Sequence, residues 1–137
     1  MTTVAIPAYR SRIAPVFDFS DCVLLINLEN NREVERTVLH LKALPPSDRV
    51  SALARGGVRI LICAGISDLL KTMLESSGIH VVGGIVGGVE DVLAAFIRNR
   101  LNEPQFSMPG LKQGHIHPGE MPESMLEDRG TTSRNRK

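Results

Sequence analysis

The stretch that decides the fold is RILICAGISDLLKTMLESSGIHVVGGIVGGVEDVLAAFIRN, residues 59–99. It contains two short apolar runs, 59–64 and 80–83, which are typical of buried strands. Each run leads into a segment with helical periodicity, 67–76 after the first and 89–99 after the second. Strands that alternate with helices in this way predict a β-α-β-α unit whose strands run parallel.

Upstream of this unit, three further runs have the length and composition of strands: residues 3–7, 22–27 and 33–41. The turn-forming sequence Glu-Asn-Asn at 29–31 separates the second run from the third and predicts a β-hairpin. Pro7 is expected to end the first strand, because a residue without an N–H group cannot continue a ladder of hydrogen bonds.

A helix is expected between the hairpin and the β-α-β-α unit. Residues 45–47 carry the signals of a helix N-terminus, and Gly56 would end the helix. Val50, Leu53 and Ala54 would share its buried face. The expected order of elements is therefore β-β-β-α-β-α-β-α.

This order predicts an α/β fold with a mixed five-stranded sheet and three main helices. When the strands are counted along the chain, right-handed crossovers favour the order 3-2-1-4-5. The first and fourth strands would then be neighbours whose connections leave in opposite directions. Ligands of open α/β sheets bind at such a switch point, beyond the carboxyl ends of the strands.

The chain is expected to hold one folded domain and a tail. Its 137 residues fit a single domain. Residues 108–137 contain few hydrophobic side chains, several prolines and glycines, and a polar end. Such a segment cannot bury enough apolar surface to offset its ordering entropy. We therefore expect the domain over residues 1–107 and a flexible polar tail over 108–137.

Composition argues against several classes of partner. The net charge is +1 and aromatic residues make up 4% of the chain, so neither a strong positive field nor a base-stacking surface for nucleic acid is expected. No apolar run approaches the ~20 residues of a membrane-spanning helix, and a cytoplasmic protein is expected. The two cysteines form no CxxC pair, which is the usual signature of a zinc or dithiol site.

Three loops should meet at the carboxyl ends of the strands: residues 8–18, 64–67 and 83–88. Two of them lead into helix N-termini, where free N–H groups can bind an anion. Their glycines either admit a ligand close to the backbone or simply form turns. Arg10 and Arg12 in the first loop either hold a phosphate or carboxylate, or are solvated surface residues.

Candidate metal ligands are few. Cys63 ends a predicted core strand, where it is either a small buried hydrophobe or a soft ligand at the open end of the sheet. Cys22 has the same two interpretations. His115 and His117 flank one residue and could bind a metal jointly, or could be ordinary surface residues. Lone histidines elsewhere are expected to be structural.

Motifs for catalysis are missing from the sequence. There is no GxxxxGK[ST] phosphate loop, no nucleophile elbow and no Ser-His-Asp order. The first strand carries no carboxylate of the kind that a nuclease of the ribonuclease H type needs to bind its catalytic metal. We therefore expect a protein that is not an enzyme, and we assign no catalytic residue.

The sequence resembles the dinitrogenase iron–molybdenum cofactor biosynthesis family over roughly residues 3–100. The resemblance rests on the order and spacing of five segments: VAIP at 4–7, IAPVF at 13–17, VRILICAGI at 58–66, GIHVV at 78–82 and GGVEDVLAAF at 87–96.

The resemblance implies a ribonuclease H-like fold without catalytic carboxylates. It also implies a non-enzymatic carrier that binds an iron–sulfur or iron–molybdenum cluster, or its precursor, and passes it to a partner protein. That partner would be a cluster donor or acceptor. The sequence leaves the oligomeric state open, with a homo-oligomer as one alternative. The alternative is a protein-interaction or regulatory domain that kept the fold and lost cluster binding.

For such a cargo, the expected cofactor-binding residues lie on the three loops and at the strand end that precedes the second loop. They are Arg10, Arg12, Pro15, Phe17, Cys63, Gly65, Ile66, Ser67, Gly84, Gly87 and Gly88, with Cys63, His115 and His117 as candidate metal ligands. The sequence departs from the common family pattern at Val16, where a histidine often stands, and at 64–67, where Ala-Gly-Ile-Ser replaces Gly-Gly-Ile-Gly. The Cys- or His-rich extension of some members is reduced here to the two C-terminal histidines.

Overall fold

The computed structural model describes residues 1–108, which form a mixed sheet with helices on both faces. The strands are β1 (Thr2–Tyr9), β2 (Arg12–Ile13), β3 (Cys22–Glu29), β4 (Arg32–His40), β5 (Val58–Ile62) and β6 (His80–Val82). The α-helices are α1 (Pro46–Arg55), α2 (Asp68–Ser76) and α3 (Val89–Ile97), and two 3₁₀ turns are η1 (Phe17–Phe19) and η2 (Pro104–Phe106).

The strand order is β4-β3-β1-β5-β6. β1, β3 and β4 pair antiparallel, whereas β1, β5 and β6 pair parallel. Counted over the five expected strands, this is the predicted order 3-2-1-4-5, and the mixed α/β class is confirmed. The difference is one additional short strand, β2, which pairs with β1 off this path and lies within the expected loop 8–18. The likeness to ribonuclease H stays a prediction.

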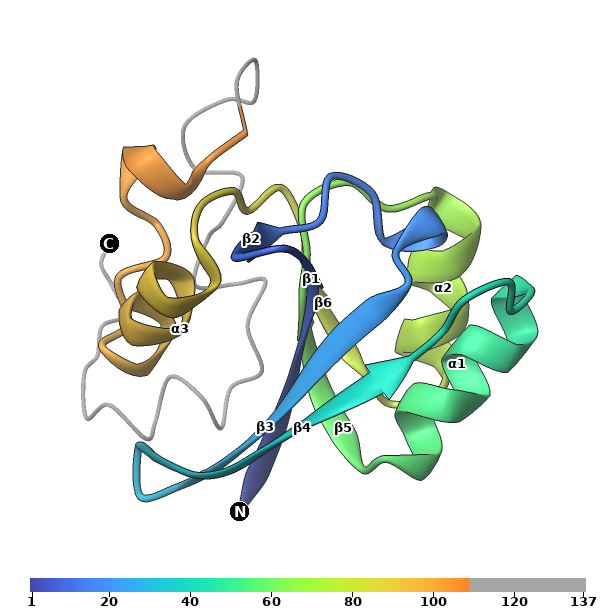
Figure 1. The fold of residues 1–137 in the computed structure, drawn as a ribbon, viewed down its shortest axis with the longest axis horizontal. Helices are drawn as coiled ribbons and strands as arrows, with labels where there is room; N and C mark the ends of the chain where they lie inside the picture. The colour runs from blue at the N-terminus through green and yellow to red at the C-terminus, as the bar shows by residue number, and fades with distance from the viewer. Residues whose placement is uncertain (109–137) are drawn as a thin grey trace.

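The helices divide between the two faces of the sheet. α3 covers one face, and α1 and α2 cover the other (Figure 1). Because side chains alternate along a strand, each central strand contributes to both cores. On β1, Val4 and Ile6 belong to the core under α3, whereas Ala5 belongs to the core under α1 and α2.

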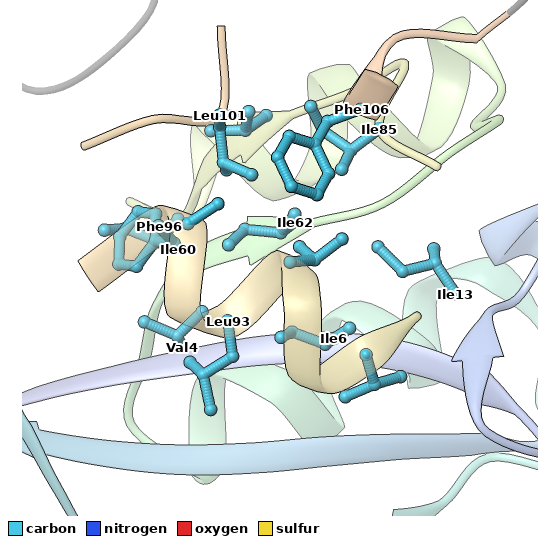
Figure 2. Close-up of a cluster of buried hydrophobic side chains, with 14 of the residues drawn as sticks. Val4, Ile6, Ile13, Ile60, Ile62, Ile85, Leu93, Phe96, Leu101 and Phe106 are labelled. Carbon is cyan, nitrogen blue, oxygen red and sulfur yellow. The ribbon is translucent and has the colours of Figure 1, made fainter. Parts of the chain in front are cut away.

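The core under α3 is built from aliphatic and aromatic side chains of several elements (Figure 2). Leu93 and Phe96 of α3 face the sheet, and both are buried. Leu101 and Phe106, which follow α3 in the chain, are buried in the same core. The segment after α3 is therefore part of the folded domain.

Pro7 does not end the first strand, which corrects the sequence prediction. β1 continues to Tyr9, and Pro7 is the register partner of Val23 on β3. The Pro7 carbonyl accepts a hydrogen bond from the Ala14 N–H at 2.9 Å, on the side away from β3. The carbonyl and N–H positions of one strand residue point the same way, so the missing proline N–H costs no bond to β3.

The buried face of α1 also differs from the prediction by one residue. Ala54 is exposed, and Ala52 is buried with Val50 and Leu53. Arg49 joins that face with only 5% of its surface exposed. It was not expected inside the protein, because arginine is almost never buried without partners.

The described chain ends at Met108, one residue past the expected domain boundary. The Met108 N–H donates to the Gly84 carbonyl at 3.0 Å, and its side chain packs against the core under α3. The other residues of the expected tail, 109–137, lie outside the described residues, so the division at residue 107 stays a prediction. None of the helices within residues 1–108 is long and apolar enough to cross a membrane.

Candidate functional site

The three predicted loops meet at the carboxyl edge of the parallel strands. Val16 and Gly65 form a parallel bridge. The Phe17 N–H donates to the Gly65 carbonyl and the Gly65 N–H donates to the Pro15 carbonyl, each at 2.8 Å. The third loop joins through the Ile13 N–H, which donates to the Gly87 carbonyl at 3.0 Å. Backbone hydrogen bonds thus hold the loops against one another.

Gly65 is explained by this contact between loops. A Cβ atom at this position would lie 2.9 Å from the Pro15 carbonyl oxygen, closer than real Cβ atoms approach. The oxygen belongs to the backbone and cannot swing away as a side chain could. The glycine therefore lets the first loop approach the second, and this role requires no ligand.

Two glycines of the 83–88 loop are likewise explained by the backbone. Gly84 has a φ of 77° and Gly87 a φ of 131°, conformations that other residues rarely adopt. The Val86 N–H donates to the Phe106 carbonyl at 2.9 Å, and the ring of Phe106 lies beside Gly87. The segment after α3 therefore packs on this loop, and of the two interpretations of its glycines, turn formation accounts for Gly84 and Gly87.

The N-terminus of α2 already has a negatively charged partner. The Asp18 carboxylate accepts a hydrogen bond from the Ser67 N–H at 2.9 Å. The Ser67 hydroxyl caps the helix by accepting from the Leu70 N–H at 3.2 Å. Ile66, which precedes this cap, is half-buried. Sequence reasoning missed Asp18, because only the fold brings it to Ser67, the helix-capping residue that lies 49 residues later in the chain.

The N-terminus of α3 is less well capped. Gly88 offers no capping side chain, and the Val89 N–H donates to the Ser11 carbonyl at 2.9 Å. Arg36 of β4 donates to the Glu90 carboxylate at 2.6 Å, and this hydrogen bond lowers the pKa of Glu90. The Asp91 carboxylate lies 3.4 Å from the place that a Cβ of Gly88 would take. An anion near this helix end would therefore meet a competing carboxylate.

Arg10 and Arg12 lie on the tip of the β1–β2 hairpin, and both are exposed. Within residues 1–108, neither arginine forms an ion pair. The Arg10 guanidinium stacks over the Tyr9 ring at 5.2 Å from its centroid. Arg12 bridges to Gly88, so the hairpin tip stands beside the start of α3. Among the predicted cofactor-binding residues, Arg10 and Arg12 therefore place exposed positive charge, not neutralised by an ion pair within residues 1–108, at the edge where the loops meet.

Cys63 lies in the core under α1 and α2 with 0% of its surface exposed. Burial, with a smaller contribution from Asp18, raises the pKa of its thiol to about 12. A cluster ligand must be a thiolate that the metal can reach. Cys63 therefore does not fit the ligand role that was one of its two interpretations.

Phe17 and Pro15 support the loop rather than line an opening. Phe17 is fully buried, whereas Pro15 is exposed and takes part through its carbonyl group. Arg49 donates to the carbonyls of Phe17 at 3.3 Å, Ser20 at 2.8 Å and Leu44 at 3.0 Å. The buried guanidinium thus fastens η1 to α1, which no sequence motif indicated.

Metal ligands are sparse in the part of the chain that the structure describes. No group of three or more His, Cys, Asp or Glu side chains lies together there. The candidate ligands His115 and His117 lie outside the described residues. Cys22 and His40 are neighbours, although they are 18 residues apart and were considered separately in the sequence. A regular hairpin counted from the Asn30–Asn31 turn would align Cys22 with Leu39. The register shift beside Leu28 moves the pairing by one residue, so that Cys22 faces His40, and the sequence gives no signal for that shift.

Fold and loops together define a small α/β domain with basic residues at the switch point of a mixed sheet. The chain belongs to the dinitrogenase iron–molybdenum cofactor family, whose sequence model matches residues 1–99. The family resemblance inferred from the sequence is confirmed. No curated protein matches the chain in a sequence search.

Solved structures share the fold. PH0822 is 25% identical with a TM-score of 0.69, and the match covers 72% of this chain and 91% of that one. MJ0327 of Methanocaldococcus jannaschii, provisionally assigned as a dinitrogenase, is 18% identical with a TM-score of 0.62, covering 73% and 92%. The apo form of the orange protein from Desulfovibrio gigas is 15% identical with a TM-score of 0.63, covering 73% and 90%. The last two likenesses concern the fold alone.

Proposed function

We propose that this protein binds an anionic metallocluster, of the iron–sulfur or iron–molybdenum type, or a precursor of one. It carries this cargo to a partner protein and catalyses no reaction. Membership of a family named for the iron–molybdenum cofactor supports the kind of cargo. The residues that bind it are the exposed arginines of the hairpin tip, Arg10 and Arg12, at the edge where the three loops meet.

The conformation of Arg10 is the observation that carries this proposal. Its φ is 59°, in the left-handed region that glycine and asparagine tolerate and other residues rarely adopt. An arginine there costs roughly 1 kcal/mol of backbone strain relative to residues suited to the turn. A binding role for the guanidinium group would account for an arginine at this position. A planar, permanent cation with several donors suits an anionic cluster.

Cargo held in this way is suited to transfer. With Cys63 buried and protonated, the hairpin tip contributes charge and hydrogen bonds and no covalent thiolate bond to the cluster. Attraction between exposed charges weakens as salt screens it. Binding is therefore expected to be reversible and sensitive to ionic strength, which favours release to an acceptor protein.

The test is anaerobic titration of the full chain with a preformed iron–sulfur or iron–molybdenum cluster, followed by visible absorption. The variant Arg10→Asn/Arg12→Ala is expected to weaken binding about tenfold, with a melting temperature equal to the wild type or higher. Arg55→Ala/Arg59→Ala is the matched control, because it removes the same charge from exposed positions at the opposite edge of the sheet. Equal weakening by both variants, or by neither, contradicts the proposed binding site.

A second function has its own support. Phe19 is 82% exposed, Leu69 62% and Val16 36%, so exposed apolar side chains lie on η1, on the residue before it and on the first turn of α2. Exposed aromatic and aliphatic residues of this kind are typical of protein-interaction surfaces. If the wild-type chain retains no cluster, an interaction or regulatory domain becomes the better description. Phe19→Ser/Leu69→Ser should then abolish capture of the partner without lowering the melting temperature.

A further inference from the structure

Cys22 and His40 face each other across the hairpin formed by β3 and β4. Cys22 is the first residue of β3, His40 is the last residue of β4, and the two are register partners. β3 and β4 run side by side through the sheet (Figure 1). The Cys22 Sγ lies 3.7 Å from the His40 Nδ1. A thiol and an imidazole nitrogen are thus held together by the strand pairing and not by a flexible loop.

The surroundings of the pair are apolar on one side and open on the other. Cys22 is half-buried and His40 is exposed. Alternation along β3 puts Cys22 on the same face as Leu24, which packs against the core under α3. Its register partner on β1 is Ala8, a small residue that also packs against that core. A ligand can reach the pair from solvent while apolar groups shield its inner side.

The distance between the two donor atoms matches tetrahedral metal coordination. Zinc bonds of about 2.3 Å to sulfur and about 2.0–2.1 Å to nitrogen, at a tetrahedral angle of roughly 109°, separate the donors by about 3.6 Å. The observed 3.7 Å therefore needs no movement of the backbone. Without metal, the same distance suits a hydrogen bond between the thiol and the ring nitrogen.

We propose that Cys22 and His40 form a binding site for a zinc-like divalent metal ion. The Cys22 thiol loses its proton when the metal binds, the His40 ring binds through Nδ1, and the displaced proton goes to solvent. Water fills the two remaining tetrahedral positions. Such an open site exchanges its ion readily, in contrast to a closed structural zinc site. The site uses other residues than the hairpin-tip arginines, and the proposal does not depend on cluster binding there.

The experiment titrates the reduced, full-length, metal-free protein with Co²⁺ and then displaces the cobalt with Zn²⁺. Coordination by Cys22 is expected to produce a near-ultraviolet thiolate-to-cobalt absorption band at one equivalent of metal. Cys22→Ser abolishes the band, and His40→Ala weakens cobalt binding by about an order of magnitude. Cys63→Ala keeps the band, because Cys63 is fully buried.

A second measurement identifies the sulfur directly. Zn²⁺ is expected to protect Cys22 from alkylation by iodoacetamide, as read by mass spectrometry of the peptide that contains it. Protection of Cys22 that is lost in His40→Ala supports the two-residue site. The proposal is overturned if Zn²⁺ leaves the alkylation rate of Cys22 unchanged. It is also overturned if His115→Ala/His117→Ala removes all cobalt binding while Cys22→Ser retains it.

Discussion

Replacing Gly65 with alanine should open the contact between the first two loops. The new Cβ would lie 2.9 Å from the Pro15 carbonyl oxygen and 3.4 Å from the Val16 Cγ2, so the loops must separate by a few tenths of an ångström. That movement strains the two hydrogen bonds of 2.8 Å that join Gly65 to Pro15 and Phe17. Each contributes about 0.5–1.5 kcal/mol. Alanine also reduces the conformational entropy of the unfolded chain, which by itself would stabilise the protein by about 0.4–1 kcal/mol.

The net expectation is a loss of roughly 1–2 kcal/mol in the free energy of unfolding, or a fall of about 5–15 °C in melting temperature. Thermal and urea denaturation measure this loss, and hydrogen exchange should show faster exchange of the Phe17 amide. Gly83→Ala is the matched control, because a Cβ there meets nothing closer than 3.8 Å. That variant should keep its melting temperature or gain a few degrees. Equal effects at both positions would refute the reasoning.

Three further predictions concern buried polar and titratable groups. Cys63→Ser should lower the free energy of unfolding by about 1–3 kcal/mol, because it buries a hydroxyl in an apolar core. Cluster binding should stay unchanged. Loss of cluster binding at normal stability would instead support Cys63 as a ligand. Burial lowers the pKa of His80 from its ordinary value of 6.5, so the unfolded chain binds the proton more readily and stability should fall as pH drops below that value. His80→Gln should flatten this slope between pH 7.5 and 5.5, measured by urea denaturation, and an unchanged slope would contradict the prediction. Arg49→Lys should lower the free energy of unfolding by about 2–4 kcal/mol, because a lysine ammonium group cannot donate to all three carbonyls that the guanidinium reaches. A melting temperature within two or three degrees of the wild type would contradict this prediction.

The candidate site was only partly predictable. The sequence placed the three loops at one edge of the sheet, and the bridges at Gly65 and Gly88 confirm that they meet there. It could not show that Gly65 and Gly87 serve contacts within the chain, because a glycine in a turn has the same letter whether it faces a ligand or a neighbouring loop. Likewise, Cys63 ends an apolar strand in either interpretation, and only its burial decides between them.

The sequence by itself determined the five main strands, the three α-helices and the strand order of the sheet, but it missed the short strand β2. Those features follow from local periodicity, from turn residues such as Asn30 and from the handedness of crossovers, all of which act over short stretches of chain. Tertiary structure alone decided that Asp18 occupies the start of α2, that Phe106 packs beside Gly87, and that Cys22 meets His40. Each of these contacts joins residues far apart in the sequence. They form only when strand pairing and core packing bring distant segments together, because the interactions that stabilise them act between segments and not within any one of them.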